Sequence, residues 1–162
     1  MNKIDVRTGI GNDIHRLVEG RKLFLGGVEV SYERGLLGHS DGDVVIHAII
    51  DAILGATGLG DIGEMFPDTD SEYKDIDSKE LLKRVIQTIT DKRFQITYID
   101  VIIQAQQPKL KEYKVRMRET LANVLNINME MINIKAKTNE GLDSIGRAEA
   151  IAALAVATVT KQ

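Results

Sequence analysis

Three side chains stand out as potential metal ligands: Asp13, His15 and His47. Asp13 and His15 are two positions apart, so in an extended chain their side chains point to the same side. Together with His47 they offer one oxygen and two nitrogens, a set that suits a tetrahedral zinc ion whose fourth position is open. The chain has no cysteine, so a metal ion has to be bound by His, Asp or Glu.

His47 belongs to a stretch, residues 40–55, that predicts a helix covered on nearly every side by apolar residues. Its first residue, a serine, is expected to cap the helix, and its last, a glycine, to end it. Such a helix should be largely buried, yet Asp43, His47 and Asp51 recur every fourth position and stack on one face. Buried charges need partners, a metal ion or an open cleft. The alternative is a narrow stripe exposed to solvent.

Hydrophobic periodicity predicts the elements that have to position these side chains. The expected order is a strand over residues 6–11, a hairpin over 22–31, the helix over 40–55, a helix capped by Ser78, a strand over 94–104, a helix over 110–125, a strand over 131–137 and a helix over 147–160. This order is typical of an α+β fold with a mixed four-stranded sheet, a small hairpin and helices on one face. The other face of the sheet is expected to pack against further subunits.

The composition is that of an ordinary globular protein. The 162 residues carry 21 Lys and Arg against 24 Asp and Glu, a net charge of −3, which does not favour nucleic-acid binding through bulk positive charge. No stretch is apolar for long enough to span a membrane. The N-terminus lacks the features of a signal or transit peptide. We therefore expect one domain over residues 1–162 in a bacterial cytoplasm, or in a plastid if a transit peptide has been removed.

Several polar motifs together resemble those of the 2-C-methyl-D-erythritol 2,4-cyclodiphosphate synthases, enzymes of the non-mevalonate isoprenoid pathway. The resemblance runs from end to end of the chain. Its most specific part is His-Ser-Asp-Gly-Asp at 39–43 followed by Phe-Pro-Asp-Thr-Asp at 66–70. The motifs that carry it are residues 9–16, 37–45 with His47, 60–63, 66–70, 106–109 and 138–140.

The resemblance implies a phosphorus–oxygen lyase. In the substrate, 4-diphosphocytidyl-2-C-methyl-D-erythritol 2-phosphate, a 2-phosphate oxygen would attack the β-phosphorus, giving 2-C-methyl-D-erythritol 2,4-cyclodiphosphate and CMP. The nucleophile belongs to the substrate, so the protein has to supply in-line positioning and charge neutralisation. The family also implies a homotrimer, with active sites at the subunit junctions and the open sheet faces around the threefold axis.

The resemblance also assigns the metals. Asp13, His15 and His47 would bind zinc, which would act as a Lewis acid and a template. Glu140 would hold Mg²⁺ or Mn²⁺ between the two phosphates. Asp51 is expected to orient His47 or to contact the substrate.

The remaining site residues are expected to bind three parts of the substrate: the phosphates, the methylerythritol unit and the cytidine diphosphate. Beside the zinc, His39 would act in catalysis and, with Ser40, hold a phosphate at the helix start. In the neighbouring subunit, Thr138 would act on the phosphates, with Asn139 beside it. The methylerythritol pocket would be formed by Asp61, Gly63, Phe66, Asp68 and Asp70. The cytidine diphosphate would be held by Gln104, Ala105, Gln106, Gln107, Pro108 and Lys109.

Some alternatives stay open. Arg147 would contact an isoprenoid diphosphate in the central cavity of the trimer, or form an ion pair between subunits. The metal set also suits a zinc hydrolase, or a metal-stabilised trimeric module that binds isoprenoid diphosphates. Turnover of the cytidyl substrate to CMP separates an enzyme from a binding module, and a cyclic product separates a cyclase from a hydrolase.

Overall fold

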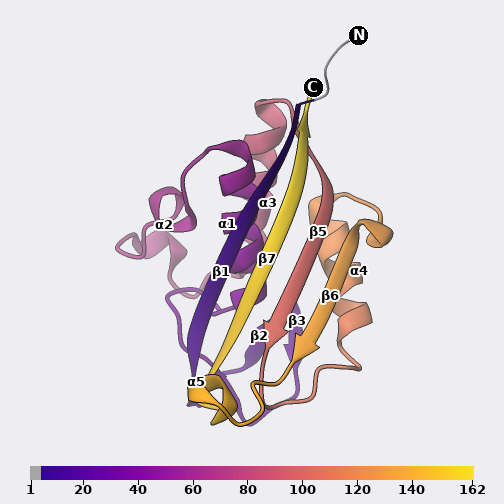
Figure 1. Cartoon of the computed structure of the whole chain (residues 1–162). Helices are drawn as coiled ribbons and strands as arrows, with labels where there is room; N and C mark the ends of the chain where they lie inside the picture. The colour runs from indigo at the N-terminus through magenta and orange to yellow at the C-terminus, as the bar shows by residue number, and fades with distance from the viewer. Residues whose placement is uncertain (1–4) are drawn as a thin grey trace.

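The computed structural model describes residues 5–162, which form a curved five-stranded sheet with the long helices on one side (Figure 1). The strand order is β4-β1-β7-β5-β6; β5 and β6 are parallel and the other neighbours are antiparallel. The α+β class is confirmed, but the sheet has five strands where four were predicted. The strands are β1 (Asp5–Glu19), β4 (Arg34–Leu36), β5 (Phe94–Gln104), β6 (Ile132–Lys137) and β7 (Ala150–Lys161), and the predicted hairpin is formed by β2 (Leu23–Leu25) and β3 (Val28–Val30).

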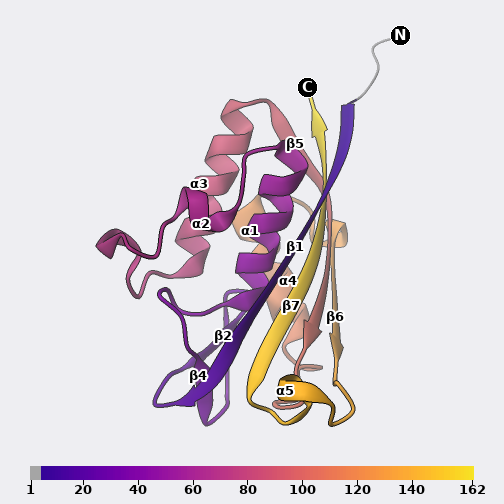
Figure 2. The ribbon, with the colours of Figure 1, turned by 60° about the vertical axis from the view of Figure 1, so that its left-hand side comes forward.

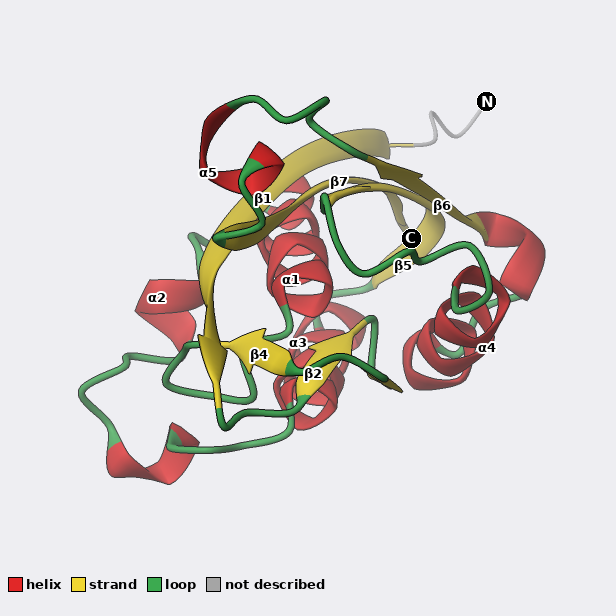
Figure 3. Ribbon diagram, turned by 90° about the horizontal axis from the view of Figure 1, so that it is seen from below, coloured by secondary structure: helices red, strands yellow, loops and turns green. Residues whose placement is uncertain are grey.

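The helices form a layer over the concave side of the sheet (Figures 2 and 3). The central helix lies against β1 and β7. The second long helix of the chain packs beside it, and the third packs against the second and against β6. No helix within residues 5–162 is long and apolar enough to cross a membrane. The predicted absence of a targeting peptide concerns an N-terminus whose residues 1–4 lie outside the described part. The long helices are α1 (Val44–Thr57), α3 (Ser78–Asp91) and α4 (Lys114–Leu125), and the short ones are α2 (Ile62–Met65), α5 (Asp143–Gly146), η1 (Ser71–Tyr73) and η2 (Met129–Met131).

Helix α1 begins and ends later than predicted. Asp43, not Ser40, is its N-cap, and its side chain accepts two backbone N–H groups of the first turn at 3.1 Å each. The helix continues through Gly55 and is ended by Gly58, whose φ of 71° lies in the left-handed region that glycine adopts without strain. Nearly all of its side chains are buried, as its apolar composition predicts.

The C-terminal segment, predicted as a helix over residues 147–160, is instead the central strand β7. The helix prediction followed its alanines, which have the highest intrinsic helix propensity. In the structure Ala153, Ala155 and Ala157 are buried on the side that α1 covers, and Leu154 and Val156 face the open side. Hydrogen-bonded strands on both edges of β7 override this intrinsic preference.

The other helices and strands begin and end closer to their predicted residues. Strand β1 continues well beyond the predicted residues 6–11 and therefore carries the first two metal-ligand candidates in its interior. Helix α3 is capped by Asp77, whose side chain accepts the N–H of Lys79, and not by Ser78. Helix α4 begins four residues later than predicted, at Lys114, while β5 lies at the predicted position.

Two glycines of β1 set the distance between this strand and α1. A Cβ atom added to Gly9 would overlap the carbonyl oxygen of Ala52, and one added to Gly11 would overlap that of Ala48. Glycine is required at both positions because the helix backbone approaches the strand so closely. The close approach brings His47 of α1 within hydrogen-bond distance of Asp13 on β1.

The sheet face that points away from the helices is open and partly apolar. Val6, Ile10 and Ile14 alternate along β1 and are 59%, 67% and 52% exposed. The register places Ile10 beside the half-buried Val156 of β7, so the apolar surface continues across the strands. Apolar patches of this kind mark interaction surfaces.

The close packing predicts that alanine has opposite effects on the free energy of unfolding at two glycines. Gly11→Ala should lower the free energy of unfolding by about 1–3 kcal/mol, because overpacking forces strand and helix apart. Gly55→Ala is the matched control on α1, since the nearest atom lies 3.8 Å from the added Cβ, and alanine favours the helix by about 1 kcal/mol. Denaturant unfolding measures both. A Gly11→Ala variant as stable as the parent would contradict the packing account.

Candidate functional site

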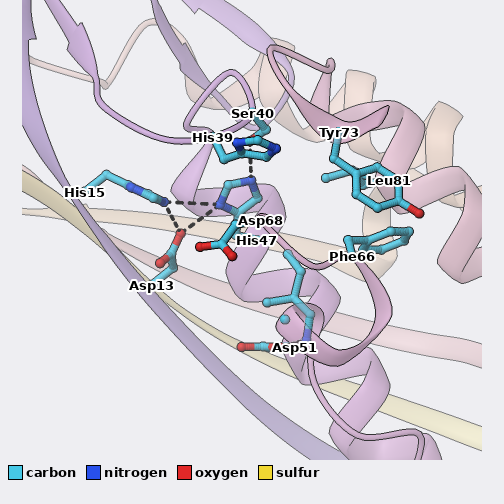
Figure 4. Close-up of a pocket in the computed structure, with 12 residues that line it drawn as sticks. Asp13, His15, His39, Ser40, His47, Asp51, Phe66, Asp68, Tyr73 and Leu81 are labelled. Atoms are coloured by element: carbon cyan, nitrogen blue, oxygen red, sulfur yellow. Dashed lines mark hydrogen bonds and ion pairs between the residues drawn. The ribbon is translucent and has the colours of Figure 1, made fainter. Parts of the chain in front are cut away.

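The three predicted metal ligands converge on one point between β1 and α1 (Figure 4). Asp13 and His15 come from the side of β1 that faces the helix, and His47 reaches them from α1. Asp13 Oδ2 lies 2.9 Å from His15 Nε2 and 2.9 Å from His47 Nδ1, and the two ring nitrogens are 3.4 Å apart. The structure therefore brings together the set that the spacing of the residues suggested.

The three ligand atoms fit a divalent metal ion. Donors bound to a tetrahedral ion at about 2.0 Å are about 3.3 Å from one another. The observed separations of 2.9–3.4 Å are close to this value. Two imidazoles and one carboxylate also leave at least one coordination position for a substrate oxygen.

The electrostatics of the cluster favour a cation. Burial disfavours ionisation of Asp13, but hydrogen bonds from His15 and His47 outweigh it and hold the pKa of this carboxyl group below its usual range. Burial also works against protonation of His15, and the hydrogen bond to Asp13 raises the pKa of its imidazole overall. The cluster thus combines an anionic oxygen with two basic nitrogens.

The second ring nitrogen of His47 has partners that differ from the predicted one. His47 Nε2 lies 3.0 Å from Ser40 Oγ and 3.0 Å from Ser78 Oγ. Asp51 was predicted to orient His47 or to contact the substrate. Its side chain accepts the backbone N–H of Ile62 at 2.7 Å, and its contact with a substrate stays a prediction. Burial raises the pKa of the Asp51 carboxyl group. Asp51 therefore anchors α2 at the wall of the site.

Asp43, the first member of the polar stripe on α1, is fully buried. Besides capping α1, its two oxygens accept the backbone N–H groups of Gly26 and Gly27 at 2.9 and 2.7 Å. Burial, together with the neighbouring Asp41 carboxylate, raises the pKa of Asp43 to about 6. Asp43 thus ties the β2–β3 hairpin to the start of the helix that carries His47.

A cavity of about 260 Å³ opens beside the metal ligands (Figure 4). One wall is polar and carries the histidines; the other is apolar, where the rings of Phe66 and Tyr73 meet edge to face at 5.3 Å. Ile62, Tyr73 and Leu81 were not predicted as site residues: Ile62 and Leu81 carry no polar group, and Tyr73 lies outside the motifs that carry the resemblance. The cavity is lined by Asp13, His15, His39, Ser40, His47, Asp51, Ile62, Gly63, Phe66, Asp68, Tyr73 and Leu81.

Two further predicted residues support the rim of the cavity without lining it. Asp61 caps α2, accepting the N–H of Glu64 at 2.9 Å. Asp70 caps η1, and its backbone carbonyl oxygen lies 3.1 Å from His39 Nε2. Both aspartates therefore fix the loop that closes this side of the pocket.

The residues predicted to hold the nucleotide, 104–109, lie at the end of β5, away from this cavity. Gln104 Nε2 donates a hydrogen bond to Asn139 Oδ1 at 3.3 Å. Gln106 Oε1 accepts the N–H of Gly141 at 3.4 Å. The two predicted loops after β5 and β6 therefore support each other.

Thr138 and Glu140 lie in the loop after β6 and do not reach the metal cluster. Thr138 Oγ1 donates to Glu140 Oε1 at 3.2 Å. Among the described residues, Glu140 joins no group of potential metal ligands. The two loops after β5 and β6 therefore lie at the β6 edge of the sheet, apart from the cluster of metal-ligand candidates on β1 and α1.

Arg147 follows α5 in the turn before β7, not at the start of a helix as predicted. Its Nε lies 3.0 Å from Glu149 Oε1, and this pairing raises the pKa of the guanidinium group. The ion pair lies within one chain, whereas the predicted alternative was an ion pair between subunits.

Comparisons with known proteins identify relatives over the whole chain. Residues 6–160 match the model of the YgbB family. The 2-C-methyl-D-erythritol 2,4-cyclodiphosphate synthase of Clostridium acetobutylicum is 56% identical, covering 93% of this chain and 97% of the relative. The bifunctional enzyme IspD/IspF of Nitratiruptor sp. is 52% identical over 94% of this chain, but only 41% of that longer protein is matched.

Solved structures with the same fold include one with a bound nucleotide. The bifunctional IspDF from Campylobacter jejuni matches with a TM-score of 0.95 and 43% identity, covering 99% of this chain and 43% of that one. The CDP complex of IspF from Plasmodium falciparum matches with a TM-score of 0.85 and 35% identity over 97% of both chains.

Proposed function

Because the chain belongs to the YgbB family, we propose that it is a metal-dependent cyclase acting on 4-diphosphocytidyl-2-C-methyl-D-erythritol 2-phosphate. The products are 2-C-methyl-D-erythritol 2,4-cyclodiphosphate and CMP. The observation that carries the proposal is the convergence of Asp13, His15 and His47 at the edge of a polar cavity. The named relatives include bacterial enzymes, and we place the reaction in the cytoplasm.

The reaction is an intramolecular phosphoryl transfer. A bond forms between an oxygen of the 2-phosphate and the β-phosphorus, and the bond from the β-phosphorus to the bridging oxygen of the diphosphate breaks. CMP leaves with that oxygen. Since both reacting groups belong to the substrate, the chain has to hold two phosphates in line and balance their charge.

Asp13, His15 and His47 would hold a zinc ion, and Glu140 would hold Mg²⁺ or Mn²⁺ between the α- and β-phosphates. Bound metal ions supply Lewis-acid stabilisation of phosphate oxygens. The three ligands of the first site come from a strand and a helix, so their positions are fixed before the substrate arrives. This rigidity reduces the ordering cost of the transfer.

His39 and Ser40 would bind a substrate phosphate beside the zinc ligands. His39 and Ser40 both line the cavity, and the His39 ring is held by the backbone carbonyl oxygen of Asp70. Arg21 donates to the backbone carbonyl oxygen of Ser40 at 2.8 Å, which holds this loop in place. The methylerythritol part would lie against the wall formed by Phe66 and its neighbours.

A homotrimer would complete each site from two subunits. The loops at 104–109 and 138–140 would hold the cytidine diphosphate against the cavity of a neighbouring chain, because they cannot reach the cavity of their own. The CDP bound to the Plasmodium falciparum relative supports a cytidine ligand. The open sheet face around Ile10 would form the trimer core. An isoprenoid diphosphate in that core would have to compete with Glu149 for Arg147.

Phosphorus NMR tests the reaction. Metal-replete protein incubated with the cytidyl substrate should give the cyclic diphosphate and CMP, and chelation should stop the reaction because the charge on the phosphates is no longer balanced. Free phosphate in place of the cyclic product would indicate a hydrolase. No turnover by metal-replete protein would contradict the proposed function.

The trimer leads to a separate prediction. Ile10→Asp should reduce the mass in solution to the 17.9 kDa of a single chain, because it places a charge in the proposed subunit interface. Val115→Asp is the matched control, since Val115 is 54% exposed on α4, away from the sheet. Sedimentation equilibrium measures both variants. A trimeric Ile10→Asp protein would contradict this interface.

A further inference from the structure

His47 uses its two ring nitrogens for different purposes. Its Nδ1 faces Asp13 and His15 in the metal cluster. Its Nε2 points the other way, toward Ser78 Oγ and Ser40 Oγ at 3.0 Å each. A metal-bound imidazole needs its second nitrogen protonated and fixed by an acceptor, since that hydrogen bond selects the tautomer and the ring orientation.

The hydrogen bonds of Ser78 show that it can be this acceptor. Ser78 Oγ lies 2.5 Å from Asp41 Oδ1, and the backbone N–H of Ser78 donates to Asp41 Oδ2 at 3.0 Å. An ionised carboxylate only accepts, so the Ser78 hydroxyl donates its proton to Asp41. The oxygen of Ser78 is then left to accept the Nε2–H of His47, so Nδ1 can release the proton that it donates to Asp13 and offer its lone pair to a metal ion.

We propose that Asp41 and Ser78 are positioning residues of the metal site, which fix the tautomer and the orientation of His47 through the chain Asp41–Ser78–His47. This inference deepens the proposed function and rests on its metal site. The three members come from three places in the sequence: the loop before α1, the first residue of α3 and the interior of α1.

The surroundings of Ser78 support its role as the hydrogen-bond acceptor for His47. A serine at a helix start usually serves as its cap, but Asp77 caps α3, so the Ser78 hydroxyl is not needed for that purpose. Ser78 is fully buried. Asp41 is itself held, because its Oδ1 accepts the N–H of Asp43 at 3.1 Å and its own N–H donates to the carbonyl oxygen of Ile76 at 3.1 Å.

Ser40 and Ser78 have different positions relative to the cavity and can therefore form different hydrogen bonds. Ser40 lines the cavity, whereas Ser78 lies behind His47 and does not. When Ser78 accepts the ring N–H, the Ser40 hydroxyl can donate its own proton to an anionic group in the cavity. Ser40 Oγ also accepts the backbone N–H of Gly42 at 3.3 Å and lies 3.4 Å from Ser78 Oγ.

The test compares Ser78→Ala with Asp77→Ala, which removes the cap of the same helix without touching His47. Zn²⁺ affinity of the metal-free proteins is measured by competition with a chromogenic chelator, and the visible spectrum is recorded after loading with Co²⁺. Ser78→Ala should bind Zn²⁺ about 10–100-fold more weakly, as loss of such outer partners usually does. Its Co²⁺ bands should shift, because the orientation of His47 is no longer fixed. Asp77→Ala should unfold at a lower temperature with unchanged affinity and spectrum.

A second variant keeps the test decisive if Ser78→Ala does not fold. In Asp41→Asn, an amide NH₂ group replaces one of the two carboxylate oxygens that accept hydrogen bonds from Ser78. One of these hydrogen bonds is lost, so this variant should also bind Zn²⁺ more weakly and show shifted Co²⁺ bands. Parent-like affinity and spectrum in the folded variants would overturn the positioning role and leave the proposed function intact. Parent protein that binds no Zn²⁺ would overturn the metal site on which both proposals depend.

Discussion

The contact between β1 and α1 is the constraint on which the site depends. At Gly9 and Gly11 the absence of a side chain lets the helix backbone touch the strand, and the alanines of β7 extend this close surface to the next strand. Asp43 fixes the start of the helix by accepting four backbone N–H groups. With both elements held in this way, ligand atoms far apart in the sequence meet at one point, and neither element has to move to bind a metal ion.

The chemistry explains why this rigidity is the main contribution of the chain. A cyclisation in which the substrate attacks itself needs no nucleophile from the protein, so its residues bind, orient and neutralise charge. Three aspartates around the cavity serve this purpose: Asp51 and Asp61 hold α2, and Asp70 holds His39. The loops predicted to hold the nucleotide follow β5 and β6, away from the cavity beside β1, so in the proposed trimer the two parts of a site come from different chains.

The parts predictable from the sequence are those with short-range signals. Asp13 and His15 share a strand face and His47 lies on a strongly apolar helix, so the metal set could be found from residue type and spacing alone. Strand β7 could not, because its alanines favour a helix locally and only its two neighbouring strands make it a strand. Ser78 was interpreted as a cap, since nothing in the local sequence indicates that its hydroxyl contacts a residue 31 positions away.

X-ray anomalous scattering from crystals of the zinc-loaded protein is the most direct test of this account. Data collected on both sides of the zinc absorption edge should place one strong peak about 2.0–2.2 Å from Asp13 Oδ2, His15 Nε2 and His47 Nδ1, between β1 and α1. A zinc peak bound elsewhere, or one that lacks His47 as a ligand, would contradict the claim that the packing of this strand and helix builds the metal site.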